Sequence, residues 1–177
     1  SNCASYCVYV AGGKHNFVHN TIAAYYGYPY TDLNIHNNIL ADDVAAVYIN
    51  NLSKNNAKTN TSFSNCIITG GRKNNLVVAT PLSDYYEGRF EGNYLRTDSL
   101  DEVYAKNNVY ASDSDSCVFQ NIYYLYREYH YYDFRLDSLS PARSIGDSIV
   151  ALSYPQDRAG NRRKQYPDAG CYEYIEE

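Results

Sequence analysis

The charged residues that could do chemistry are densest between Arg89 and Asp115. Polysaccharide lyases need a Lys or Arg base beside acidic calcium ligands, and glycoside hydrolases need carboxylates placed across a groove. Asp113 and Asp115 are alternate residues that would point the same way in a strand and suit a weak calcium site, but nothing completes it. A solvated acidic loop is the favoured interpretation, and no complete catalytic constellation is found. The candidates are Arg89, Arg96, Asp98, Glu102, Lys106, Asp113 and Asp115.

Tyrosine gives the second chemical signal, because the chain has 22 Tyr but no Trp. In the stretch 122–132, strand alternation places Tyr124 and Tyr126 on one face and Tyr123 and Leu125 on the other. One face could form an aromatic platform for sugar rings or a protein partner. A Tyr-lined core, with hydroxyls bonded to loop backbone, is slightly favoured. The predicted ligand-binding residues are Tyr85, Tyr86, Arg89, Arg96, Tyr124 and Tyr126.

The composition narrows the partners of this 177-residue chain. Its formal charge of -5 disfavours nucleic acid, which requires clustered Lys and Arg. No apolar run approaches the roughly 20 residues that span a bilayer. Five scattered Cys without a C-x-x-C pair indicate buried free thiols and no zinc site, and no cofactor is predicted beyond weak calcium.

A short segment returns several times along the chain, in the form apolar, any residue, Asn or Gly, small or polar, apolar, apolar. Asn and Gly most readily adopt a left-handed backbone, and one such residue between two strands makes a sharp bend. We therefore predict stacked corners, with each Asn side chain able to bond the Asn one coil away. The predicted corner residues are Asn20, Asn37, Asn65, Gly92 and Asn107.

The spacing of these corners and the runs between them predict the elements that position the loops. The steps from Asn37 to Asn65 and from Asn65 to Gly92 fit a coil with a loop, whereas the first and last steps are short. Either those coils have very short turns, or one segment is a local strand pair and not a full coil. The runs that should form one further sheet are Cys7–Val10, Ala46–Ile49 and Leu76–Ala79. His19 and His36 beside the corners could bind a metal, but no third ligand recurs and simple stacking is favoured.

The repeat stops near Tyr132, and three motifs follow: Ser140–Pro141–Ala142, Asp157 to Arg162, and Asp168 to Tyr174. In this order they resemble the ending of bacterial right-handed parallel β-helix proteins of the choice-of-anchor Q type. Arg143 and Cys171 depart from the pattern of that family, which usually has an apolar residue and Ala there. The resemblance implies secretion or display on the surface of a Gram-negative bacterium, often in polysaccharide use, and it supplies no catalytic residue.

We therefore predict an all-β, right-handed parallel β-helix over residues 1–132, with an irregular C-terminal cap over 133–177 that covers the exposed last coil. The chain is expected to be cut from a longer exported precursor with an N-terminal signal and earlier coils. The favoured function is an extracellular or outer-membrane protein, such as a lipoprotein, that binds a glycan or a partner protein. Two alternatives stay open: part of a lyase or glycoside hydrolase whose centre lies in earlier coils, and a structural component of an outer-membrane complex.

Overall fold

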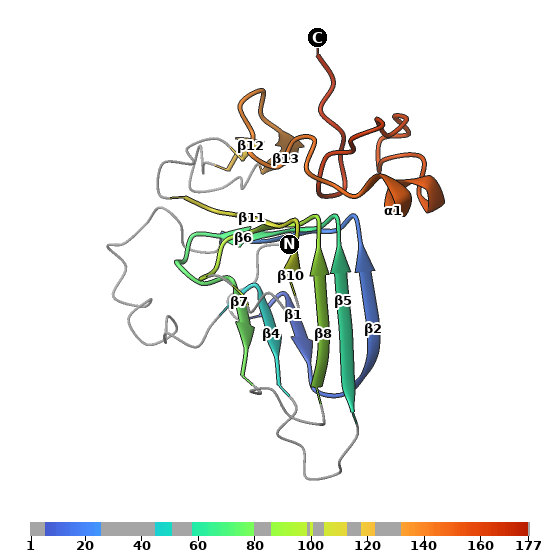
Figure 1. Cartoon of the computed structure of the whole chain (residues 1–177). Coiled ribbons are helices and arrows are strands. Elements are labelled where there is room, and N and C mark those ends of the chain that lie inside the picture. The colour runs from blue at the N-terminus through green and yellow to red at the C-terminus, as the bar shows by residue number, and fades with distance from the viewer. Residues whose placement is uncertain are drawn as a thin grey trace, which may run out of the picture.

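Three parallel sheets form the larger part of the protein, and the chain passes through them in a fixed order (Figure 1). The computed structural model describes residues 6–25, 45–50, 58–79, 86–98, 100, 105–112, 118–122 and 132–176. The first sheet contains β1 (Val8–Val10), β4 (Val47–Ile49) and β7 (Leu76–Val78). The second contains β2 (Gly13–Val18), β5 (Thr59–Ser64), β8 (Tyr86–Glu91) and β10 (Ala105–Lys106). The third contains β3 (Thr21–Ala24), β6 (Ile67–Gly70), β9 (Tyr94–Leu95) and β11 (Val109–Tyr110).

Each complete repeat contributes one strand to every sheet, and all neighbouring strands within these sheets are parallel. The all-β class with parallel sheets is therefore confirmed. The three runs expected to share a sheet do so as β1, β4 and β7. A fourth, shorter repeat adds β10 and β11 to the second and third sheets only, as far as the described residues go. This explains the short last step between corners.

The corners between the second and third sheets have the predicted left-handed backbone. Residues 19, 65, 92 and 107 directly follow paired strand ends and have φ of 50°, 53°, 67° and 54°. Asn65, Gly92 and Asn107 are therefore confirmed as corners. Asn20 is wrong by one position, because Val18 pairs with Ser64 and places His19 level with Asn65. The predicted corner at Asn37, and His36 beside it, lie outside the described residues.

The hydrogen-bonding asparagine ladder runs one position after the corner. Asn93 Nδ2 donates to Phe63 O at 2.9 Å and to Asn108 Oδ1 at 2.9 Å, while Asn93 Oδ1 accepts from Cys66 N at 2.7 Å. These bonds tie three successive repeats together and satisfy backbone groups that the bend removes from the sheets. Cys66 occupies this position in the second repeat as a buried free thiol, and burial raises its pKa to about 12.

The space enclosed by the sheets is filled by stacked side chains. The Phe17 and Phe63 rings lie 4.5 Å apart and those of Phe63 and Phe90 5.3 Å apart, both nearly parallel. These three residues are in register on β2, β5 and β8, so their inward positions repeat along the stack. Each such aromatic pair contributes about 0.5–1.5 kcal/mol beyond simple burial.

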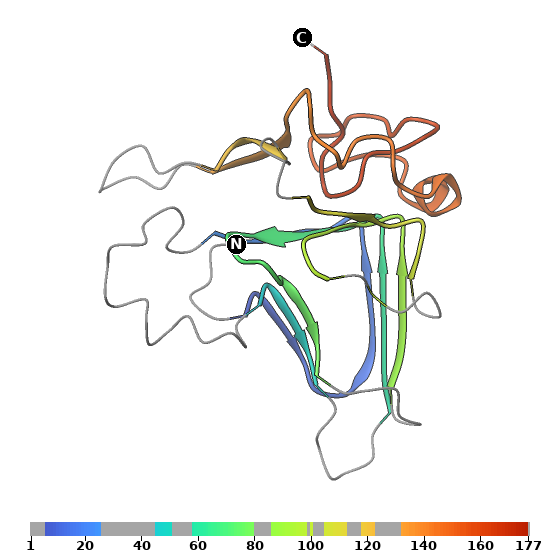
Figure 2. The same ribbon diagram turned by 60° about the vertical axis from the view of Figure 1, so that its left-hand side comes forward.

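The C-terminal segment lies against the outer face of the third sheet (Figure 2). It contains β13 (Asp133–Leu136), which pairs antiparallel with β12 (Phe119–Asn121), and the short helix α1 (Ser148–Ser153). Asn65 exchanges two hydrogen bonds with the backbone of Asp147, and Gly170 N donates to Asn65 O at 2.8 Å. These contacts lie on the second repeat, whereas we expected a cap on the last one. All four residues of β6 are buried, with Ile67 and Thr69 on one face and Ile68 and Gly70 on the other, so the outer face of this sheet requires a cover.

The motif residues of the C-terminal segment hold its irregular backbone together. Asp157 accepts hydrogen bonds from the backbone N–H groups of Ala159, Asn161 and Glu173. Burial opposes the ionisation of Asp157, but these donors outweigh it and hold its pKa below the usual value. Arg163 and Glu173 form a buried ion pair at 2.8 Å. The turn around Asp157 therefore has a structural role.

Candidate functional site

The outer face of the second sheet is the most polar surface that the stacked strands build. Strand alternation sends Thr61, Phe63 and Phe90 inward and leaves their neighbours facing solvent. The parallel register then arranges the outward residues in rows across the repeats. The first row is Lys14, Asn60 and Glu87; the second is Asn16, Ser62 and Arg89; the third is Val18, Ser64, Glu91 and Lys106.

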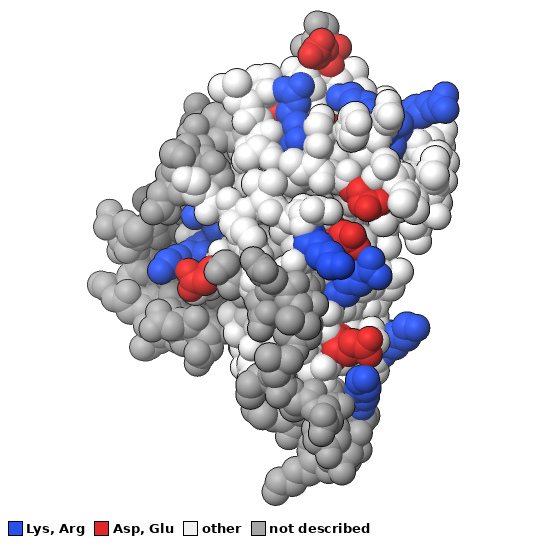
Figure 3. All heavy atoms as spheres, in the orientation of Figure 1, with Lys and Arg blue, Asp and Glu red and all other residues white. Residues whose placement is uncertain are grey.

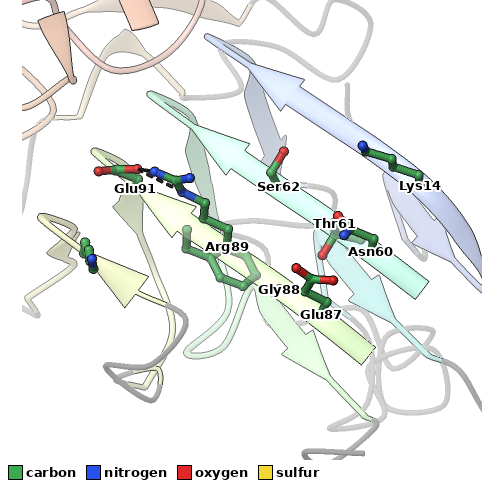
Figure 4. A pocket seen from close by; sticks show the side chains of 10 residues that line it. Lys14, Asn60, Thr61, Ser62, Glu87, Gly88, Arg89 and Glu91 are labelled. Atoms are coloured by element: carbon green, nitrogen blue, oxygen red, sulfur yellow. Dashed lines mark hydrogen bonds and ion pairs between the residues drawn. The ribbon is translucent and has the colours of Figure 1, made fainter. Parts of the chain in front are cut away.

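These rows enclose a shallow groove of about 500 Å³. Figure 4 shows Lys14 on β2, Asn60 and Ser62 on β5, and Arg89 on β8 around it. Gly88 pairs with the inward Thr61, and a Cβ there would collide with the Tyr86 ring and hydroxyl, so its missing side chain makes room inside the stack and not in the groove. Figure 3 shows Lys, Arg, Asp and Glu side chains gathered together over the second sheet. The lining residues are Lys14, Asn60, Thr61, Ser62, Glu87, Gly88, Arg89, Phe90, Glu91 and Lys106.

The charges in this groove divide into paired and unpaired groups. Arg89 binds Glu91 on its own strand through Nε at 3.1 Å and through Nη2. Lys58 pairs with Glu87 at 3.1 Å, and its hydrogen bond and charge lower the pKa of that carboxyl. Among the described residues, Lys14 and Lys106 form no ion pair. The groove therefore has cations available for a ligand, whereas its carboxylates are neutralised.

The structure separates the predicted ligand-binding residues. Arg89 lines the groove. Tyr86 points into the stack, where its hydroxyl lies 3.2 Å from Thr61 Oγ1 and its ring lies beneath Gly88. Arg96 follows β9 in the third sheet, donates its backbone N–H to Ile68 O, and does not line the groove. The other three, Tyr85, Tyr124 and Tyr126, lie outside the described residues, as do Asp113 and Asp115.

Several groove residues were missed because their role depends on register between repeats. Lys14, Asn60, Ser62 and Glu87 belong to segments with no resemblance to one another at the outward positions. Aligning the repeats on the inward Phe residues and the corners would have placed them in two adjacent rows on the outer face of one sheet. The available signal was the alternation of Tyr86, Gly88 and Phe90 with the charged Glu87, Arg89 and Glu91, which predicts a strand with one solvated face.

The arrangement of the groove is suited to binding. Glu87 and Glu91 lie four residues apart on one strand, about 13 Å between Cα atoms, and a cation neutralises each. Asp98 pairs with Lys73 on an exposed turn elsewhere. The described residues contain no group of three His, Cys, Asp or Glu arranged to hold a metal ion.

A second aromatic feature lies on the outer face of the first sheet. Tyr9 and Tyr48 are in register and their rings stack 5.7 Å apart, with an angle of 4° between planes. The Tyr6 ring lies 4.8 Å from that of Tyr48. Tyr9 and Tyr48 each turn one ring face toward the other. A sugar platform requires an exposed ring face, and we interpret this stack as structural.

Comparisons with protein-family models, with curated proteins and with solved structures found no match to this chain. No helix in the described part of the chain has both the length and the apolar character needed to cross a membrane.

Proposed function

We propose that the chain is part of a right-handed parallel β-helix that binds an acidic polysaccharide along the outer face of its second sheet. The repeated strand order, the parallel register and the left-handed corners support this architecture. Right-handedness follows from a general rule, since connections between parallel strands of one sheet almost always have that hand. The resemblance of the C-terminal motifs to β-helix proteins displayed by bacteria is consistent with an extracellular or outer-membrane position.

The observation that carries the binding proposal is a pair of cations at the two ends of a groove of about 500 Å³, Lys14 and Lys106, which form no ion pair with any residue that the structure describes. Between them lie the amide of Asn60 and the hydroxyl of Ser62, which can bond sugar hydroxyl groups. Strands in a parallel sheet repeat at about 4.8 Å, so equivalent groups recur along a line that an extended chain can follow. Carboxylate or sulfate groups on such a chain would complement the lysines.

The direct test is calorimetric titration of the protein with polygalacturonate and, in parallel, with its fully methyl-esterified form. We expect binding to the acidic polymer and at least tenfold weaker binding to the neutral one. The double variant Lys14→Ala/Lys106→Ala should lower the affinity at least tenfold. Lys73→Ala removes an exposed cation outside the groove and should leave the affinity unchanged.

Failure to bind any acidic polysaccharide, or binding that the groove variants leave unchanged, would count against the proposal. Catalysis in the same protein stays a separate hypothesis, which predicts the release of reducing or unsaturated ends from the polymer. That assay can be run on the same titration samples.

A further inference from the structure

Large apolar side chains are exposed mainly on the C-terminal segment. In the described part of the chain the sheets expose only Tyr9 strongly, whereas the segment exposes Leu139, Ile149, Leu152, Tyr154, Tyr166 and Ile175. On α1, Ile149 is 74% exposed and Leu152 is 80% exposed. They are three residues apart and therefore lie on the same side of the helix. Exposed apolar side chains placed together in this way mark interaction surfaces.

Cations lie beside Leu152, in a hollow that Ile149 does not line. This hollow of about 470 Å³ runs along α1, with Ala151, Leu152 and Pro155 on its apolar side and Arg162 and Lys164 on its charged side. We call Ile149, Leu152, Pro155, Arg162 and Lys164 the α1 patch. The whole chain has a formal charge of -5, yet this patch contains no carboxylate.

The nearest acidic side chains in the sequence are already engaged. Asp157, the one carboxylate between residues 148 and 166, is buried and accepts hydrogen bonds from its own turn. Asp147 caps α1 by accepting from Ile149 N at 2.7 Å and Val150 N at 3.0 Å. Lys164 is partly engaged, because its Nζ lies 3.9 Å from a carboxylate oxygen of the buried Asp168 and donates to Tyr174 O at 2.8 Å. Arg162 forms no ion pair with any residue that the structure describes, so it is the cation of the patch that is available to an anionic partner.

The position of α1 is fixed, so the exposure of its apolar side chains is built into the fold. The backbone of Asp147 forms two hydrogen bonds with Asn65 at the corner of the second repeat. Ala151 faces the protein and is buried, which holds Ile149 and Leu152 away from it. In Figure 1 the helix lies at the outer edge of the molecule, where a broad surface could approach it.

We propose that the α1 patch docks the protein on an anionic lipid surface. Protruding aliphatic side chains can enter the acyl boundary of a bilayer, while Arg and Lys beside them contact lipid phosphates. A sugar chain is a poorer fit, because stacking on sugars uses flat aromatic faces and the side chains at the centre of this patch are aliphatic. This inference is independent of the polysaccharide groove, which lies on the second sheet.

Co-sedimentation of the full chain with vesicles tests the proposal. We expect binding to vesicles that contain phosphatidylglycerol and much weaker binding to vesicles of phosphatidylcholine alone. Ile149→Ser/Leu152→Ser should lower the partition coefficient at least tenfold. Arg162→Ala should lower it about fivefold, which corresponds to about 1 kcal/mol for one cation near an anionic surface.

Leu139→Ser is the matched control, because Leu139 is also 80% exposed on the same segment but does not line the hollow. It should leave vesicle binding unchanged, as should the groove variant Lys14→Ala/Lys106→Ala. Equal binding to both kinds of vesicle, an equal loss in Leu139→Ser, or no binding to any vesicle would overturn the proposal. The proposal would also be overturned if inorganic phosphate, at the same molar concentration as the anionic lipid, displaced the protein from the vesicles. A simple anion site would then be enough to explain the binding.

Discussion

The outer faces of the second and third sheets lie in the same repeats but have opposite characters. On β5 the outward residues Asn60, Ser62 and Ser64 are polar and partly exposed, and alternate with buried inward residues. On β6, directly after the corner, all four residues are buried. The first pattern is typical of a sheet with one solvated face, and the second of a sheet covered on both sides. The second sheet therefore has a face open to solvent, whereas the third holds the C-terminal segment.

The largest effect should come from the covered face of the third sheet. Ile67 is fully buried there, against the C-terminal segment. Ile67→Ala should lower the free energy of unfolding by about 2–5 kcal/mol, because it removes buried methyl groups and leaves a cavity. Urea denaturation measures this, with Ser62→Ala on the outer face of the second sheet as the control. Equal small effects at both positions would show that the C-terminal segment does not cover the sheet tightly.

The corner that joins the two faces should be the next most sensitive place. Gly92 has a φ of 67°, and an added Cβ would lie 2.6 Å from Asn65 Oδ1 and 3.0 Å from Asp147 N. Gly92→Ala should therefore cost about 1–3 kcal/mol through backbone strain and crowding. Asn107→Gly keeps the left-handed backbone at an exposed corner and should change stability by less than about 0.5 kcal/mol. Thermal unfolding of both variants tests whether the conformation or the side chain matters.

The corners and the first sheet could be predicted from the sequence because their signals are local. A left-handed residue is most often Asn or Gly, and a short apolar run between polar loops indicates a strand. His19 was missed as a corner because the predicted pattern allowed only Asn or Gly there and the adjacent Asn20 matched it, although His also adopts this conformation more often than most residues. Its neighbours explain the exception: His19 is buried beneath the C-terminal segment and its Nε2 lies 3.1 Å from Asn65 Nδ2.

The groove and the position of the C-terminal segment could not be predicted from local sequence signals. Lys14 and Arg89 approach each other only through the register of three strands, which depends on the lengths of the intervening loops. The segment was expected on the last coil because an exposed strand edge invites aggregation. The burial of both faces of β6 was indicated by the run Cys66-Ile67-Ile68, but a short apolar run does not show what covers it.

The buried contact of His19 with Asn65 should make the stability of the fold sensitive to mild acid. Burial and the nearby Arg163 charge lower the pKa of His19 from 6.5 to about 4. The unfolded chain then binds a proton more readily than the folded one, so stability is lost as pH falls from 6.5 toward 4. At pH 5 this loss should be about 1–2 kcal/mol. His19→Asn should remove most of this loss of stability at pH 5. Denaturant unfolding of both proteins at pH 7 and pH 5 measures the difference. If the variant has the same pH dependence as the original protein, His19 does not titrate as proposed.

The solvated face of the second sheet should show the smallest effect on stability. Arg89 is largely exposed and its ion pair with Glu91 lies within one strand, so Arg89→Ala should change the free energy of unfolding by less than about 0.5 kcal/mol. The same change should weaken binding to polygalacturonate several-fold, because it removes a groove donor and leaves Glu91 unpaired beside the acidic polymer. Denaturation and titration on one preparation separate the two effects. If Arg89→Ala destabilises the fold as much as Ile67→Ala does, the two faces do not differ in the way their burial indicates, and the second sheet must support the fold as the third does.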